Sequence, residues 1–186
     1  MTRPSIALLA PTLITLAGCG PPTSAGLATT RTLMPATRHA QCLERRGLPD
    51  KRCTPGAVRA GVSLTAVCAY GYSSSVRPPE GYTEPLKFRQ MRAYGLSGSP
   101  RDYEEDHLVP LSIGGAPRDP ANLWPEPRHG PNGSEKKDEL ETWAARMACS
   151  RRIPLARLQR EIANDRIAVY RATGGSRLLS AYPPGG

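Results

Sequence analysis

The stretch Glu105–Asn122, reading EDHLVPLSIGGAPRDPAN, decides the fold that this sequence predicts. Asp106 and His107 are consecutive, so in an extended strand their side chains point to opposite faces. Apolar residues then alternate along the chain at Val109, Leu111 and Ile113. The pair Gly114-Gly115 permits the positive φ angles of a tight turn. We therefore expect a strand that runs through this region and folds back at the glycines.

The segment after the turn predicts a returning strand and a helix. Asn122-Leu123-Trp124 is short and apolar enough to be the second strand, which would bring Asn122 near the Asp-His pair. From Asn132 onward the sequence indicates a helix, with Asn132 as N-cap and Glu135 at its third position. Apolar residues recur at helical spacing at Leu140, Trp143, Ala144 and Met147.

Three further elements are expected around this unit. Residues 62–70 are rich enough in apolar and β-branched residues for a short N-terminal strand. Residues 83–94 indicate a helix with Leu86, Phe88 and Met91 inside and with cations outside at Lys87, Arg89 and Arg92. Residues 154–172 indicate a last helix with its apolar stripe at Leu155, Leu158, Ile162 and Ile167. The expected class is α+β, a small hairpin-plus-helix core with flanking helices.

The motif DHLVPLSIGG, followed by NLWPEP, resembles the HNH endonuclease family, whose ββα-metal fold is a hairpin packed on one helix. The resemblance implies that Asp106 binds one divalent cation (Mg²⁺, Mn²⁺ or Zn²⁺), that His107 is the general base, and that Asn122 holds the histidine. Much of residues 55–172 also resembles exported HNH-like bacterial proteins. The implied function is a metal-dependent endonuclease that hydrolyses DNA or RNA with little sequence specificity.

The chemistry of phosphodiester hydrolysis suits these residue types. A phosphodiester is an anion, so hydrolysis needs a cation to neutralise charge and a base to deprotonate water. Imidazole is mostly neutral near pH 7, and carboxylates suit hard cations. In the first turns of the predicted helix Asp138 is the preferred second ligand, with Glu135 and His129 as secondary candidates. The acids could instead only favour the helix dipole, and His129 could be a solvated loop residue.

The N-terminus indicates export. Arg3 precedes an apolar run, Ile6–Ala17, that suits a secretory signal peptide over residues 1–18. The sequence Leu-Ala-Gly-Cys that ends at Cys19 resembles the lipobox of bacterial lipoproteins, which implies a lipidated Cys19 and a membrane-anchored protein outside the cytoplasmic membrane. An ordinary signal peptide is the alternative. Residues 19–40 indicate a Pro-, Thr- and Ala-rich tether, and residues 41–183 a single nuclease-like domain.

Four cysteines remain after Cys19, an even number in a chain bound for an oxidising compartment. Three pairings are possible, and we favour a local Cys42–Cys53 disulfide with a long-range Cys68–Cys149 disulfide. Zinc is the competing interpretation, but none of these cysteines has CxxC spacing.

The net charge of +9 favours polyanionic partners, and nucleic acid bound through its phosphates is the one we expect. Two alternatives to the nuclease remain open. A lipoprotein could keep the ββα framework as a binding or structural module without catalysis. A carbohydrate hydrolase could use paired acids such as Glu104, Glu105 and Asp106, although consecutive carboxylates on a strand point in alternating directions.

Overall fold

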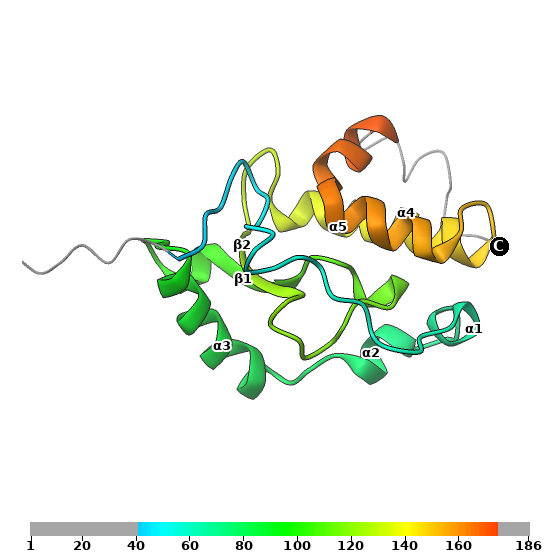
Figure 1. Ribbon diagram of the computed structural model, residues 1–186, viewed down its shortest axis with the longest axis horizontal. Coiled ribbons are helices and arrows are strands. Elements are labelled where there is room, and N and C mark those ends of the chain that lie inside the picture. Colours follow the sequence, from blue (N-terminus) through cyan, green and yellow to red (C-terminus); the bar gives the residue numbers. More distant parts are fainter. Residues whose placement is uncertain (1–40, 175–186) are drawn as a thin grey trace, which may run out of the picture. The chain divides into compact units, whose positions relative to one another are not determined.

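A computed structural model describes residues 41–174, which form a mixed α+β domain with five α-helices and one two-stranded antiparallel sheet. The helices are α1 (Leu64–Val67), α2 (Tyr72–Val76), α3 (Glu80–Ala93), α4 (Ser134–Cys149) and α5 (Leu155–Ala172), and the strands are β1 (Tyr103–His107) and β2 (Leu123–Pro127). The hairpin lies between α3 on one side and α4 with α5 on the other (Figure 1). The expected α+β class is therefore confirmed.

The hairpin has the predicted order but a shorter first strand than predicted. Asp106 lies opposite Trp124, and His107 opposite Leu123. The strand ends at His107, and a 3₁₀ helix spans Leu111–Ile113, so the predicted extension to Ile113 was wrong. Pro110 has no backbone N–H to donate to a β-ladder, which favours an end to strand pairing before this residue. The alternating apolar side chains are nevertheless buried, because the 3₁₀ helix packs on α4.

The loop between the strands is closed by hydrogen bonds to one side chain. The Asn122 amide oxygen accepts from Val109 N at 2.8 Å, and its nitrogen donates to Val109 O at 3.0 Å and Ala116 O at 3.2 Å. The backbone passes so close that a Cβ on Gly115 would overlap the Val109 carbonyl oxygen. Gly114 has φ +84°, as predicted for this turn. The double glycine therefore permits both the turn and the close approach.

The main core lies between the loop, α4 and α5. Its buried members are Val109, Ile113, Leu140, Ala144, Met147, Ala148, Leu158 and Ile162. The helix α4 begins at Ser134 with Gly133 as N-cap, so the predicted Asn132 cap was wrong. Asn132 instead donates its side-chain amide to the Arg46 carbonyl at 2.8 Å. A tertiary partner far along the chain has replaced the local capping bond.

The segment before the hairpin differs most from the prediction. Residues 62–70 contain the helix α1 rather than a strand, because the Ser63 hydroxyl accepts from Ala66 N and caps the helix, while β1 and β2 pair with each other. In α3, Lys87 is 5% exposed and Phe88 is 46% exposed, the reverse of the expected pattern. Burial of Lys87 is stabilised by its 2.7 Å ion pair with Glu84.

Two disulfides are present within the described residues, and they are the pairings favoured from the sequence. Cys42–Cys53 closes a short loop, and Cys68–Cys149 links the end of α1 to the end of α4 over 81 residues. The long link helps to hold α1 and the following α2 near the hairpin loop. A cross-link of this span also removes much of the conformational freedom of the unfolded chain.

The predicted signal peptide (1–18), the lipidation site Cys19, the tether (19–40) and the last residues of the predicted domain (175–183) lie outside the described residues. Among the helices of residues 41–174, none combines the length and apolar character needed to cross a bilayer.

The close approach of the backbone at Gly115 predicts that two glycines differ in the stability lost on substitution by alanine. Gly115→Ala should lower the free energy of unfolding by at least about 2 kcal/mol, because the added methyl group overlaps backbone and lies 2.7 Å from the Asn122 amide nitrogen. Gly81→Ala, in the first turn of α3 with no atom within 4 Å of its Cβ, should be neutral or stabilising by up to about 1 kcal/mol. Urea unfolding measures both, and equal losses would contradict this account of the loop.

Candidate functional site

Asp106 and His107 end β1 and point to opposite sides, as a strand requires. The Asp106 carboxylate reaches α4, where its Oδ2 accepts a 2.8 Å hydrogen bond from Lys137 Nζ. The His107 ring points the other way, and its Nε2 lies 3.0 Å from the Pro117 carbonyl oxygen. The end of β1 therefore carries one carboxylate and one imidazole, which face opposite sides of the hairpin and contact different residues.

The hydrogen bond to Pro117 assigns the tautomer of His107. A carbonyl oxygen only accepts, so Nε2 carries the proton and Nδ1 keeps its lone pair. Burial lowers the pKa of His107 below its ordinary value, while the Pro117 hydrogen bond and the charge of Asp106 oppose that shift. His107 is thus a neutral imidazole near pH 7 with a basic Nδ1.

Asn122 acts on His107 through the loop rather than by direct contact. The resemblance implied that Asn122 holds the histidine, but its amide bonds only to Val109 and Ala116. Ala116 precedes Pro117, whose carbonyl engages the ring. A backbone carbonyl therefore orients the imidazole, and Asn122, which is completely buried, holds the backbone that carries it.

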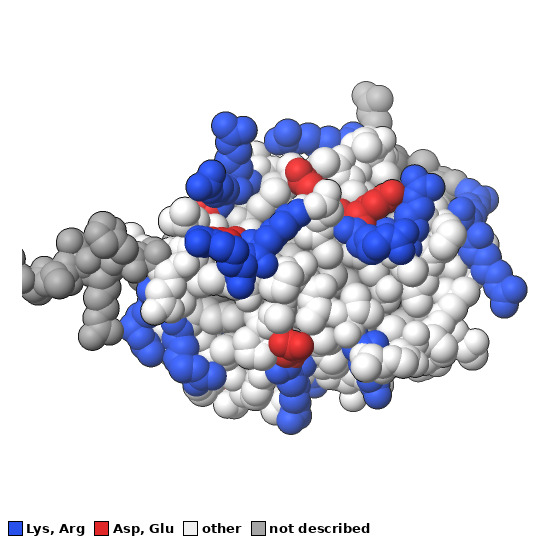
Figure 2. Space-filling model, in the orientation of Figure 1, with Lys and Arg blue, Asp and Glu red and all other residues white. Residues whose placement is uncertain are grey.

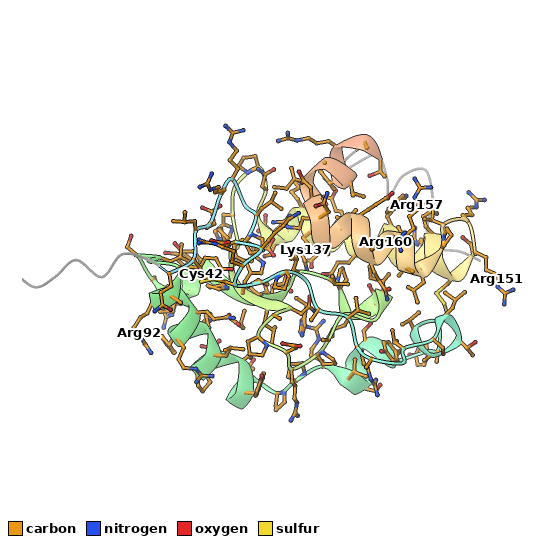
Figure 3. All side chains as sticks on the ribbon, in the orientation of Figure 1. Cys42, Arg92, Lys137, Arg151, Arg157 and Arg160 are labelled. Atoms are coloured by element: carbon orange, nitrogen blue, oxygen red, sulfur yellow. A yellow bond between two sulfur atoms is a disulfide. The ribbon has the colours of Figure 1, made fainter. Side chains whose placement is uncertain are left out.

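A buried lysine is the centre of the acidic side of the site. Lys137 is fully buried in the interior of the domain (Figure 3), and its ammonium bonds to Asp106 and to Glu141 one turn along α4. Although burial opposes the charged form, the charges of both acids raise the pKa of Lys137. Burial raises the pKa of Asp106 and the Lys137 charge lowers it, with a net lowering. The ammonium and the Asp106 carboxylate therefore both stay ionised at neutral pH.

The three predicted candidates on and before α4 occupy different places. Asp138 is exposed at the surface of α4. Partial desolvation of its carboxyl group, together with the negative charge of Asp106, raises the pKa of Asp138, so the two carboxylates interact electrostatically. His129 and Glu135 pair with each other at 3.3 Å between Nδ1 and Oε1, and their side chains are 75% and 69% exposed. Asp138 is therefore the candidate whose charge interacts with that of Asp106, whereas the secondary candidates form a surface pair.

The carboxylates offer a partial donor set for a hard cation. Within residues 41–174 no group of three or more His, Cys, Asp or Glu side chains is arranged to hold a metal. Mg²⁺ commonly uses only one or two carboxylates, and waters and substrate phosphate complete its coordination. Asp106, the first ligand predicted from the sequence, keeps lone pairs beyond those used by Lys137 and by the His107 backbone N–H.

A cavity of about 190 Å³ adjoins His107 on the side away from α4. Glu105 shares a strand face with His107 and is 9% exposed, and neither carboxylate oxygen has a hydrogen-bond partner among the described residues. Burial raises the pKa of Glu105 to about 8, against the opposing charge of Lys87. Cationic residues also line the cavity, namely Arg77, Lys87 and Arg128.

Sequence reasoning missed Lys137 and Glu141, and it considered Glu105 only as one of the paired acids of a carbohydrate hydrolase, although the spacing of each carried a signal. Lys137 and Glu141 have the i, i+4 spacing of a helical ion pair. Glu105 and His107 have the i, i+2 spacing of one strand face. Neither spacing indicates burial, because that depends on which element covers the face.

No protein-family model matches this chain, and neither a curated protein nor a solved structure is significantly similar to it. The residues and geometry of the site therefore carry the functional proposal.

Glu105 predicts a pH dependence of stability. Its folded pKa of about 8 exceeds the ordinary 4.5, so its contribution is fully present below pH 4.5 and is lost as pH rises towards 8. At about 1.36 kcal/mol per pKa unit the loss is at most about 5 kcal/mol, and about half of that is expected because the carboxyl faces a cavity that admits water.

Glu105→Gln should therefore match the wild type near pH 4 and exceed it in unfolding free energy by about 2 kcal/mol at pH 8. Urea unfolding across this range measures the difference. Glu80→Gln, at an exposed residue of the same cavity, should change stability by less than about 0.5 kcal/mol. Parallel curves for Glu105→Gln and wild type would show that the carboxyl is not held in a desolvated state.

The buried ammonium predicts a large difference between adjacent lysines. Lys137→Met should lower the unfolding free energy at pH 7 by about 3–5 kcal/mol, because it leaves Asp106 and Glu141 without their cation. Lys136→Met, which removes a half-buried 3.3 Å pair with Glu139, should cost less than about 1 kcal/mol. Denaturation of both variants provides the measurement, and similar losses would contradict the assigned role of Lys137.

Proposed function

We propose that this chain is a metal-dependent phosphodiesterase that cleaves DNA or RNA with little sequence specificity. The observation that supports it most is the state of His107, a neutral imidazole whose Nε2–H is engaged by Pro117 and whose Nδ1 is basic. Such a nitrogen, on the residue next to Asp106 in the chain, suits proton transfer from water in phosphodiester hydrolysis.

The chain's own residues divide the chemistry as follows. His107 Nδ1 accepts a proton from the attacking water as the water oxygen bonds to phosphorus. The bond between phosphorus and the leaving ester oxygen breaks, and that oxygen takes up a proton from solvent. The negative charge of Asp106 favours the imidazolium that results. Asp106 and Asp138 would hold a hard cation, Mg²⁺ or Mn²⁺, which would neutralise charge on the phosphate. Lys137, from α4, holds the Asp106 carboxylate of β1 in place by a hydrogen bond and keeps it ionised.

The charge of the surface supports a polyanionic substrate. On the face shown in Figure 2, Lys and Arg predominate over Asp and Glu. Exposed arginines occur at both ends of the domain, Arg92 on α3 at one end and Arg151 after α4 at the other (Figure 3). Such scattered cations contact phosphates rather than base edges, which fits non-specific binding.

A second candidate is a non-catalytic binding module, and the Lys137 ion pair is the observation that favours it. An ammonium beside Asp106 already supplies a positive charge at the carboxylate where the nuclease would bind its cation. In this case the ion pair would be purely structural, and the site would bind no metal.

The two candidates differ in a direct assay. Purified full chain should degrade plasmid DNA or RNA with Mg²⁺ or Mn²⁺, with Zn²⁺ included for comparison, and EDTA should stop the reaction. His107→Ala should lower the rate by at least about 100-fold, the usual contribution of a general base. His129→Ala removes an exposed histidine paired with Glu135 and should leave the rate within about twofold. Absence of cleavage with every metal by a folded wild-type protein would refute the nuclease and favour the binding module.

We also propose that the protein is exported and lipidated at Cys19. Metabolic labelling with a radioactive fatty acid should mark the wild type and spare Cys19→Ser, and equal labelling would refute lipidation there.

A further inference from the structure

Arg77 is a cation of the His107 cavity that the sequence-based site did not include. It follows α2 directly, is exposed, and lines the 190 Å³ cavity together with His107 and Glu105. The other two cations of this cavity are paired with acids, Lys87 with Glu84 at 2.7 Å and Arg128 with Glu104 at 2.8 Å. Among the described residues, the Arg77 guanidinium has no hydrogen-bond or ion-pair partner.

The cavity brings Arg77 and the proposed base together. Both residues line it, with His107 contributed by the end of β1 and Arg77 by the segment that follows α2. A phosphate group that entered this cavity would therefore meet the guanidinium and the imidazole at once.

The backbone around Arg77 is well supported. Pro78 is buried and follows it, and Pro79 is the N-cap of α3, so two fixed φ angles define how the chain leaves α2. The helix α2 packs on α1 and on the 3₁₀ helix Leu111–Ile113. The disulfide Cys68–Cys149 anchors the start of this segment. An arginine on such a support can present a guanidinium with less loss of conformational entropy than one on an unsupported loop.

We propose that Arg77 binds a non-bridging oxygen of the scissile phosphodiester. This inference rests on the proposed nuclease function and names a substrate-binding residue for it. The planar guanidinium can donate two parallel hydrogen bonds to phosphate, and its charge opposes the negative charge that grows on the oxygens as water attacks. A carboxylate of a protein partner is the competing ligand for this cation, and the His107 imidazole in the same cavity favours phosphate.

Binding without turnover tests the contact. The full chain is titrated in EDTA with a thymine dinucleotide and with the same dinucleotide carrying an uncharged methylphosphonate linkage, followed by heteronuclear NMR. The wild type should bind the charged ligand about 10- to 100-fold more tightly, as a charge-assisted hydrogen bond predicts. Arg77→Ala should lose most of this preference, and Arg77→Lys should keep part of it because it keeps the charge without the planar fork.

Arg171→Ala is the matched control. It removes the same charge from an exposed residue in the last turn of α5, which does not line the His107 cavity, and should keep the wild-type preference. In the cleavage assay Arg77→Ala should lower kcat by about 100- to 1,000-fold with a smaller change in KM, and added guanidinium should restore part of the rate.

The outcomes separate the two proposals. A wild-type chain with no preference for the charged dinucleotide, or an Arg77→Ala variant with an unchanged preference, overturns the role of Arg77 even if cleavage is found. Arg77-dependent preference without cleavage supports the contact and overturns the nuclease alone. Equal losses in Arg77→Ala and Arg171→Ala would show a general charge effect and also overturn the specific contact.

Discussion

The tie between Asn122 and the loop that follows β1 is the constraint on which the site depends. A single buried amide holds both backbone groups of Val109 and the carbonyl of Ala116. This closure requires the Gly115 backbone to pass against Val109, which only glycine permits. Because Pro117 follows Ala116, the same closure positions the carbonyl that orients His107. The geometry of the imidazole is thus set by backbone packing several residues away.

Two buried ion pairs connect the strands of the hairpin to the helices. Lys137 joins α4 to β1 through Asp106, and Arg166 joins α5 to β2 through its ion pair with Glu126. Burial of such groups carries a large desolvation cost, and apolar residues of similar volume would often be as stable. Burial also raises the pKa of Glu126 to about 8 despite its arginine partner. The ion pairs of Lys137 and Arg166 offset part of this cost and tie both strands of the hairpin to the helices.

The hairpin-plus-helix core was predictable because its signals are local. The adjacent Asp106 and His107, the double glycine and the helical recurrence of Leu140, Ala144 and Met147 depend on spacing along one segment. The errors have a common physical origin. A strand was predicted at residues 62–70 from composition, but no strand edge is used there and the Ser63 cap stabilises a helical turn instead. Lys87 was placed outside because charge usually implies exposure, whereas its pair with Glu84 allows burial.

The sequence by itself determined the order of the site, with an acid, a base and an asparagine in one short segment, since these positions follow from strand and turn periodicity. Tertiary structure alone decided the partners of each group. It gave His107 the Pro117 carbonyl and Asp106 the Lys137 ammonium, and it placed Arg77 beside the histidine cavity. These contacts join residues 10 to 31 positions apart, and the cavity joins residues 30 apart. No local pattern specifies them, because burial, tautomer and electrostatic environment depend on which elements pack together.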